Sequence, residues 1–158
     1  MNSSILHNVP ILIQKQTWSC WYTSLQMVVK YYRNQGKGGL KDPSEVKETQ
    51  DLYVNNVGIG GGFDPATERE RIAKKLGFTS LYMSLTNEGM WQLIKKGPVI
   101  YAGQWPGLSS GHWVVIVGVS SGKLAINNPA IGRQTWGYDQ FMGKYLLQTA
   151  ERPLIYVP

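Results

Sequence analysis

Residues 20–33 read CWYTSLQMVVKYYR. Their apolar side chains recur at spacings of three and four residues, at Tyr22, Leu25, Met27, Val28, Val29 and Tyr32. This spacing predicts an α-helix that is buried along most of its length, because residues three and four apart share one face of a helix. Ser19 is a favourable N-cap residue, so we expect the helix to begin at Cys20.

Three more helices are expected after this one. Residues 42–45, Asp-Pro-Ser-Glu, combine a capping residue, a first-turn proline and a glutamate at the third helical position, which predicts a helix to about Tyr53. Asp64-Pro65 repeats the start signal, and Gly77 ends the third helix. The fourth is expected over residues 86–96, where a Gly-Pro pair follows.

Apolar, β-branched runs dominate the second half of the chain. They predict strands over residues 78–84, 98–105, 111–119, 123–127 and 154–157, with a short extended segment at 9–13 and a small helix at 138–145. Ser120-Ser121-Gly122 predicts a tight turn between two of these strands. Helices followed by an antiparallel sheet are typical of the α+β class, so we predict one domain over residues 1–158 in which helix 20–33 and shorter helices pack on the sheet.

Composition limits the classes of partner. Of the 158 residues, 42% are hydrophobic and 16% are charged, which is typical of a globular protein. The net charge of +6 favours an acidic partner, but lysine and arginine are spread along the chain, so we expect no nucleic acid partner. The apolar runs are too short to span a bilayer and no basic region precedes the first of them, so we expect no membrane partner and no signal peptide.

The residues that commonly hold metals and cofactors are scarce. One cysteine and two histidines do not fill a structural zinc site, so we predict no metal. Residues 58–62, Gly-Ile-Gly-Gly-Gly, precede a predicted helix but lack the lysine and hydroxyl residue of a phosphate-binding loop. We interpret them as a flexible loop and expect no cofactor.

Cys20 is the only cysteine, so the chain forms no intramolecular disulfide and the thiol is available for chemistry. A thiol reacts as the thiolate, and a helix N-terminus and a nearby imidazolium both lower its pKa. Of the two histidines, His112 opens an apolar strand that could aim it, whereas His7 lies near a terminus. Each of these residues is as readily a packing residue, and the neighbouring tryptophans line either a pocket or the core: Trp18, Trp21, Trp105 and Trp113.

Three short stretches carry polar residues in a fixed order: Gln-Lys-Gln-Thr-Trp-Ser-Cys-Trp at 14–21, Gly-His-Trp at 111–113, and Asn-Asn-Pro at 127–129. This pattern resembles papain-like cysteine proteases, in particular the effector proteases of plant-pathogenic bacteria and the double-glycine leader peptidases. The resemblance implies that Cys20 is the nucleophile and His112 its base, that Asn128 orients the base, and that Gln14 supplies the oxyanion hole with the Cys20 backbone N–H.

The third member of this triad has two candidates. In the bacteriocin-type relatives an aspartate usually precedes the proline, whereas this chain has Asn128, as papain has asparagine. Asn127 is the alternative. Side chains alternate between the faces of a strand, so the two asparagines cannot both face His112.

The resemblance also implies a function. It indicates an endopeptidase that cuts protein or peptide substrates, that is delivered as an effector or toxin module into target cells, and that a cognate immunity protein inhibits by covering the active site. A double-glycine leader peptidase is an alternative, although such peptidases usually precede a transporter, which we do not expect here. A deamidase or amidase with the same thiol and imidazole, and a non-catalytic binding module, are further alternatives.

Overall fold

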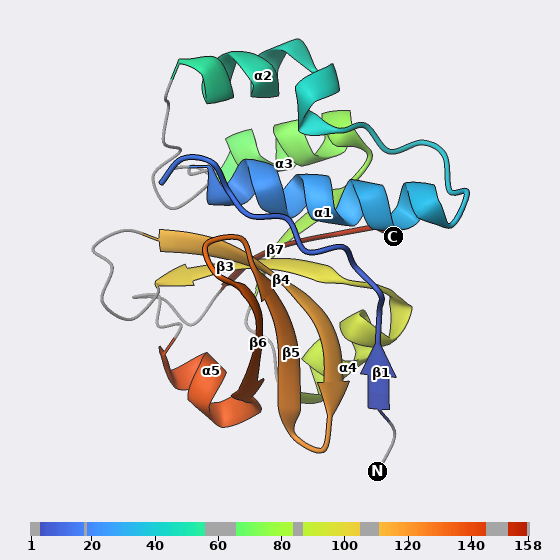
Figure 1. Ribbon diagram of the computed structural model, residues 1–158, viewed down its shortest axis with the longest axis vertical. Helices are drawn as coiled ribbons and strands as arrows, with labels where there is room; N and C mark the ends of the chain where they lie inside the picture. The colour runs from blue at the N-terminus through green and yellow to red at the C-terminus, as the bar shows by residue number, and fades with distance from the viewer. Residues whose placement is uncertain are drawn as a thin grey trace.

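The structure is a computed structural model that describes residues 4–17, 19–55, 66–83, 87–104, 111–144 and 152–157 (Figure 1). Helices lie on both sides of an antiparallel sheet, which confirms the predicted α+β class. In the described part of the chain no helix is both long enough and apolar enough to cross a membrane.

Helix α1 spans Cys20–Asn34, as the apolar spacing predicts, and most of its side chains are buried. Ser19 occupies the N-cap position, but its hydroxyl donates to the Gln16 carbonyl oxygen (3.0 Å) and makes no capping bond. The predicted N-cap position and helix start are therefore confirmed, but the Ser19 side chain does not cap the helix. Without a side-chain cap, the first N–H groups of α1 remain for other partners.

The sheet contains seven strands within the described residues: β1 Ser4–Leu6, β2 Thr79–Met83, β3 Val99–Gln104, β4 Gly111–Ser120, β5 Lys123–Asn128, β6 Gly132–Gly137 and β7 Arg152–Tyr156. Their order is β2-β7-β3-β4-β5-β6, with β1 paired to β4 and every pair antiparallel. The five predicted strands are confirmed, while β1 and β6 were not predicted. Ser121 and Gly122 turn the chain between β4 and β5 with φ of 49° and 76°, the two positive values of a type I′ turn.

The N-terminal strand differs from its prediction. Residues 9–13 form no strand, and β1 lies upstream of them. The register between β4 and β5 shifts between Ile116 and Gly118, and the carbonyl of Val117 accepts the His7 backbone N–H (2.8 Å). A Cβ at Gly118 would lie 2.5 Å from the Ile5 carbonyl oxygen, so glycine is required for β1 to approach β4.

The remaining helices form two layers. They are a 3-10 turn at Pro43–Glu45 and the helices α2 Lys47–Val54, α3 Ala66–Leu76, α4 Asn87–Lys96 and α5 Tyr138–Lys144. Figure 1 shows α1, α2 and α3 on one side of the sheet and α4 and α5 on the other. The predicted capping box of Asp42 and Glu45 forms, but it begins the 3-10 turn, because the extended Val46 separates that turn from α2. Gly77 ends α3 with a φ of +93°.

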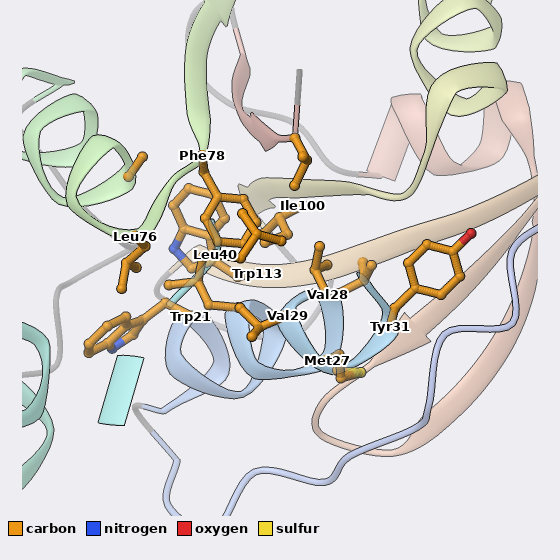
Figure 2. Close-up of a cluster of buried hydrophobic side chains, with 14 of the residues drawn as sticks. Trp21, Met27, Val28, Val29, Tyr31, Leu40, Leu76, Phe78, Ile100 and Trp113 are labelled. Atoms are coloured by element: carbon orange, nitrogen blue, oxygen red, sulfur yellow. The ribbon is translucent and has the colours of Figure 1, made fainter. Parts of the chain in front are cut away.

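Two apolar clusters hold these layers to the sheet. Figure 2 shows the first, between α1, α3 and the sheet, where Trp21 and Val28 of α1 lie with Trp113 of β4. The second places Ile94 of α4 and Phe141 of α5 against the opposite face. Each buried side chain of this size contributes about 1.5–3 kcal/mol, so the first cluster fixes the start of α1 relative to β4.

Candidate active site

Cys20 lies at the junction of α1 and β4. It is the first residue of α1, and its side chain is only 7% exposed. α1 packs on β4, where the Ser24 hydroxyl donates to the carbonyl oxygen of Trp113 (3.4 Å), the residue that follows His112. The packing of α1 on β4 therefore brings the predicted nucleophile to the strand that carries the predicted base.

Burial controls the protonation of both groups. It raises the pKa of the Cys20 thiol above its ordinary value of 9.0, and the backbone N–H groups of Trp113, Trp21 and Cys20 itself offset only part of this rise. Burial also lowers the pKa of His112 below 6.5, against the opposing effect of its bond to Asn128. The expected net lowering of the thiol pKa by the helix start is thus wrong. Both shifts favour the uncharged forms, a thiol and a neutral imidazole, and a neutral imidazole suits His112 as a general base.

His112 contacts one of the two candidate asparagines. Its Nε2 lies 2.8 Å from Oδ1 of Asn128, and both side chains are buried, with 5% and 1% exposed. Val115 pairs with Asn127 across β4 and β5. Continued by one residue, this register would place Val114 opposite Asn128, so His112, two residues from Val114, lies diagonally across from Asn128 on the same face.

The surroundings of Asn128 determine the tautomer of His112. Oδ1 of Asn128 also accepts the backbone N–H of Ala130 (3.0 Å), and because that group only donates, the atom it meets must be the amide oxygen. Nε2 of His112 must therefore carry a hydrogen to bond the same oxygen. In the neutral ring this leaves Nδ1 with its lone pair, able to accept a proton from a thiol.

Gln134 on β6 is a site residue that sequence reasoning missed. Its Oε1 accepts the Nδ2 hydrogen of Asn128 (3.0 Å), so both ends of the Asn128 amide are held. β6 has few apolar residues, and its register with β5, Asn128 with Gly132 and Ile126 with Gln134, is what brings this side chain to Asn128. A glutamine in a polar stretch gives no sequence signal for such a role.

Asn127 faces the other way. Its Nδ2 donates to the carbonyl oxygen of Val9 (3.1 Å), and its Oδ1 accepts Nε of Arg133 (2.6 Å). Asn127 therefore ties the N-terminal segment and β6 to β5. The structure brings Asn128, and not Asn127, to His112.

Gln14 lies beside the Asn128 turn, but its amide is engaged. Its backbone N–H donates to the Pro129 carbonyl oxygen (2.7 Å). Its side-chain Nε2 donates to the carbonyl oxygens of Gln16 (2.8 Å) and Thr17 (3.3 Å). Both side-chain N–H groups are thus bound within the loop that leads to Cys20, and the second bond is the longer and weaker one.

The other candidates lie elsewhere. The Nε2 of His7 bonds the Ile94 carbonyl oxygen (2.6 Å) and its Nδ1 bonds the Tyr31 hydroxyl (3.1 Å), which holds the N-terminus to two helices. Trp21 and Trp113 are 1% exposed and belong to the core. Trp18, Trp105 and residues 58–62 lie outside the described residues. Among the side chains that the structure describes, no three of the His, Cys, Asp or Glu type are grouped so as to hold a metal.

Comparisons with known proteins give the family and the fold. A family model described as the papain-like cysteine protease AvrRpt2 matches residues 3–146, which include helices α1 to α5. No curated protein sequence matches the chain.

Three solved structures are similar over nearly their whole length. A C39-like peptidase from Bacillus anthracis has 18% identity and a TM-score of 0.67, covering 99% of this chain and 98% of its own. The peptidase domain of Streptococcus ComA, a bifunctional ABC transporter of a quorum-sensing pathway, has 19% identity and a TM-score of 0.59, with 96% and 100% covered. A double-glycine-motif protease from an AMS/PCAT transporter, in complex with the leader peptide, has 21% identity and a TM-score of 0.58, with 97% and 94% covered. At these identities the similarity establishes a shared fold.

Proposed function

The chain belongs to the papain-like cysteine protease family of AvrRpt2 and is a cysteine protease; we propose that it cleaves peptide bonds of protein substrates with Cys20 as nucleophile, His112 as base and Asn128 as the residue that orients the base. The observation that carries this proposal is the 2.8 Å bond between His112 Nε2 and Asn128 Oδ1. His112 lies on β4, and α1, whose first residue is Cys20, packs on this strand through the bond from the Ser24 hydroxyl to the Trp113 carbonyl oxygen.

The proposed reaction has two halves. Cys20 Sγ attacks the carbonyl carbon of the scissile bond while Nδ1 of His112 takes the thiol proton, and His112 then gives that proton to the departing amine as the C–N bond breaks. Water next attacks the thioester, His112 accepts a proton from it, and the S–C bond breaks to release the acid and restore the thiol. Asn128 accepts the Nε2 hydrogen throughout, which keeps Nδ1 as the reacting nitrogen.

Charge on the substrate oxygen must be stabilised during both attacks. The Cys20 backbone N–H and the Gln14 side-chain amide are the proposed donors. Because Gln14 Nε2 already bonds two loop carbonyls, we propose that the substrate oxygen replaces the 3.3 Å bond to Thr17 and leaves the 2.8 Å bond to Gln16 in place. The remaining bond would keep the amide aimed at the thiol.

The biological setting is also a proposal. We propose that the chain acts as an effector or toxin module inside target cells, and that a cognate immunity protein inhibits it by covering the active site. The family match to AvrRpt2 and the resemblance to effector proteases of plant-pathogenic bacteria support this setting. Cleavage of double-glycine precursors is the second candidate, supported by the fold shared with the two transporter-associated peptidases.

A comparison of the native chain with Cys20→Ala tests the reaction. Each is incubated with a lysate of the intended target cells, and new protein termini are identified by mass spectrometry. We expect discrete cuts with the native chain and none with Cys20→Ala. Equal cleavage by both would refute the assignment of Cys20, deamidated residues without new termini would indicate a deamidase, and cuts confined to Gly-Gly sites would indicate a leader peptidase.

A further inference from the structure

An apolar surface lies next to the active site. Ile11, Ile13 and Ile131 are 45%, 53% and 65% exposed, among the few large hydrophobic side chains that are exposed in the described chain. We call these three residues the isoleucine patch. Leu12, between the first two, packs on the core, so Ile11 and Ile13 point outward by alternation. Apolar side chains gathered at the surface of a soluble protein are typical of an interaction site.

The two segments that carry the patch lie side by side. The backbone N–H of Gln14 donates to the Pro129 carbonyl oxygen (2.7 Å), and Cγ2 of Ile11 lies 4.0 Å from the position that a Cβ of Gly132 would take. Figure 1 shows the segment between β1 and α1 passing beside the turn that joins β5 to β6. One segment ends at the proposed oxyanion donor Gln14, and the other begins after Asn128, so the patch continues directly into the site.

The charge around the patch has one sign. The chain has ten acidic residues, and none lies in residues 1–41 or 89–138, the regions that contain both segments, Cys20 and His112. Lys15 follows Ile13 by two residues on the same outward side, and Arg133 follows Ile131; both are exposed.

Carboxylates of the neighbouring layer do not offset this charge. Three of them form ion pairs of their own: Glu45 with Arg33, Glu48 with Arg71 and Lys75, and Asp51 with Lys47. The surface beside the site is therefore apolar with a cationic margin, and its complement is an apolar side chain next to a carboxylate.

We propose that the isoleucine patch binds an extended segment of the protein substrate, and that it selects a branched or aromatic apolar residue with an acidic neighbour. The proposal rests on the proposed function only for the identity of the cleaved bond. Ile11 is three residues from Gln14, a span of at most about 11 Å in extended chain. The selected residue therefore lies within roughly three positions of the scissile bond on one side.

Peptide profiling tests the proposal. The native chain is incubated with tryptic peptides of a bacterial proteome, and the sequences around new termini are compiled by mass spectrometry. We expect apolar residues next to Asp or Glu to be enriched within three positions of the cut. Ile131→Ser and Ile11→Ser should lower kcat/KM for the enriched peptides about tenfold, as loss of a small apolar contact does. Lys15→Glu should remove the preference for the acidic neighbour.

Val54→Ser is the matched control, because Val54 is 64% exposed on α2, outside the patch. It should leave the profile unchanged, and urea unfolding followed by tryptophan fluorescence reports folding in every variant. An unchanged profile in the isoleucine variants, or an equal change in Val54→Ser, would overturn the proposal.

A binding measurement separates the patch from the reaction. Immobilised Cys20→Ala is exposed to the same peptide mixture, and the retained peptides are sequenced. If the native chain cuts nothing, the proposed function fails, yet loss of apolar acidic peptides when Ile131→Ser is added would still support the patch. Retention of the same peptides by both would overturn it. So would a concentration-dependent dimer of the native chain that Ile131→Ser abolishes, which would assign the patch to self-association.

Discussion

Asn127 and Asn128 are adjacent on β5 and equally buried, but they belong to different regions of the molecule. Asn127 bonds the Val9 carbonyl oxygen of the N-terminal segment and Arg133 of β6. Asn128 faces the opposite side, where it bonds His112, Ala130 and Gln134. The first region holds chain segments together, and the second holds an imidazole in one tautomer. Because neighbouring side chains on a strand point to opposite faces, the two asparagines make different contacts.

The comparison predicts that removal of the Asn128 side chain lowers activity. Asn128→Ala should lower kcat about a hundredfold, the scale of a positioned general base, because Nε2 of His112 loses its acceptor and either ring nitrogen can then carry the hydrogen. KM should change little. Steady-state kinetics on a cleaved peptide measure both.

Asn128→Asp is the matched variant. Its carboxylate still accepts hydrogen bonds from His112 and Ala130, and Gln134 can turn its amide to donate, so activity should be retained. Near-native kcat in Asn128→Ala would refute the orienting role.

The comparison also predicts that removal of the Asn127 side chain lowers stability. Asn127→Ala should lower the free energy of unfolding by about 2 kcal/mol, because the carbonyl of the buried Val9 loses its donor and the Arg133 guanidinium loses its acceptor. Turnover per folded molecule should fall less than tenfold, about 1.4 kcal/mol in barrier terms. Urea unfolding followed by tryptophan fluorescence measures stability, with kinetics on the same sample. If Asn127→Ala instead kept its stability and lost activity as expected for Asn128→Ala, the third site residue would be Asn127.

The two regions were not equally predictable from sequence. Helix α1 and strands β3 to β5 follow from apolar periodicity and tight-turn residues, which are local signals, whereas the roles of Cys20 and His112 follow from the family resemblance. β6 reads Gly-Arg-Gln-Thr-Trp-Gly, with alternating exposure and little apolar content, so it has no strand signal without its neighbour. The apolar segment at 9–13 was predicted to be extended, but it pairs with no strand of the sheet. Its side chains lie partly in the core and partly on the surface beside the site.

Hydrogen bonds between distant residues were the least predictable. Ser19 has the residue type of a cap, yet the Gln16 carbonyl takes its hydroxyl. The choice between Asn127 and Asn128 depends on strand register and on the Ala130 N–H, neither of which sequence spacing fixes. Burial reversed the expected direction of the thiol pKa, because burial depends on tertiary packing around the start of α1.

Substitution of Gln134, which supports Asn128, is expected to lower kcat by a smaller factor. Gln134→Leu removes the acceptor of Asn128 Nδ2 but leaves the Ala130 N–H on Oδ1, so the amide keeps one of its two anchors. We expect kcat to fall about fivefold, roughly 1 kcal/mol in barrier terms, with KM unchanged. Gln134→Glu retains an acceptor oxygen and should restore kcat. If both variants lost activity in proportion to lost stability, Gln134 would be a packing residue and not a positioning residue.

The smallest effect is the pH dependence of stability. Burial raises the pKa of Cys20 above 9.0, so at alkaline pH the unfolded chain loses a thiol proton that the folded chain keeps, and the free energy of unfolding falls as pH rises above 9.0. Burial lowers the pKa of His112 below 6.5, so the unfolded chain gains a proton first as pH falls, and stability decreases below 6.5.

Cys20→Ala should therefore lose less stability than the native chain between pH 7 and about pH 10, where an ordinary thiol is ionised. Asn127→Ala, which alters the structural side of β5 and leaves the thiol in place, should lose as much as the native chain over the same interval. Urea unfolding of the three proteins at both pH values measures the difference, and all other titratable groups are common to the three. Equal losses in the native chain and in Cys20→Ala would show that the thiol does not resist ionisation in the folded protein. His112 would then face a thiolate, and the reaction would begin from an ion pair instead of a proton transfer.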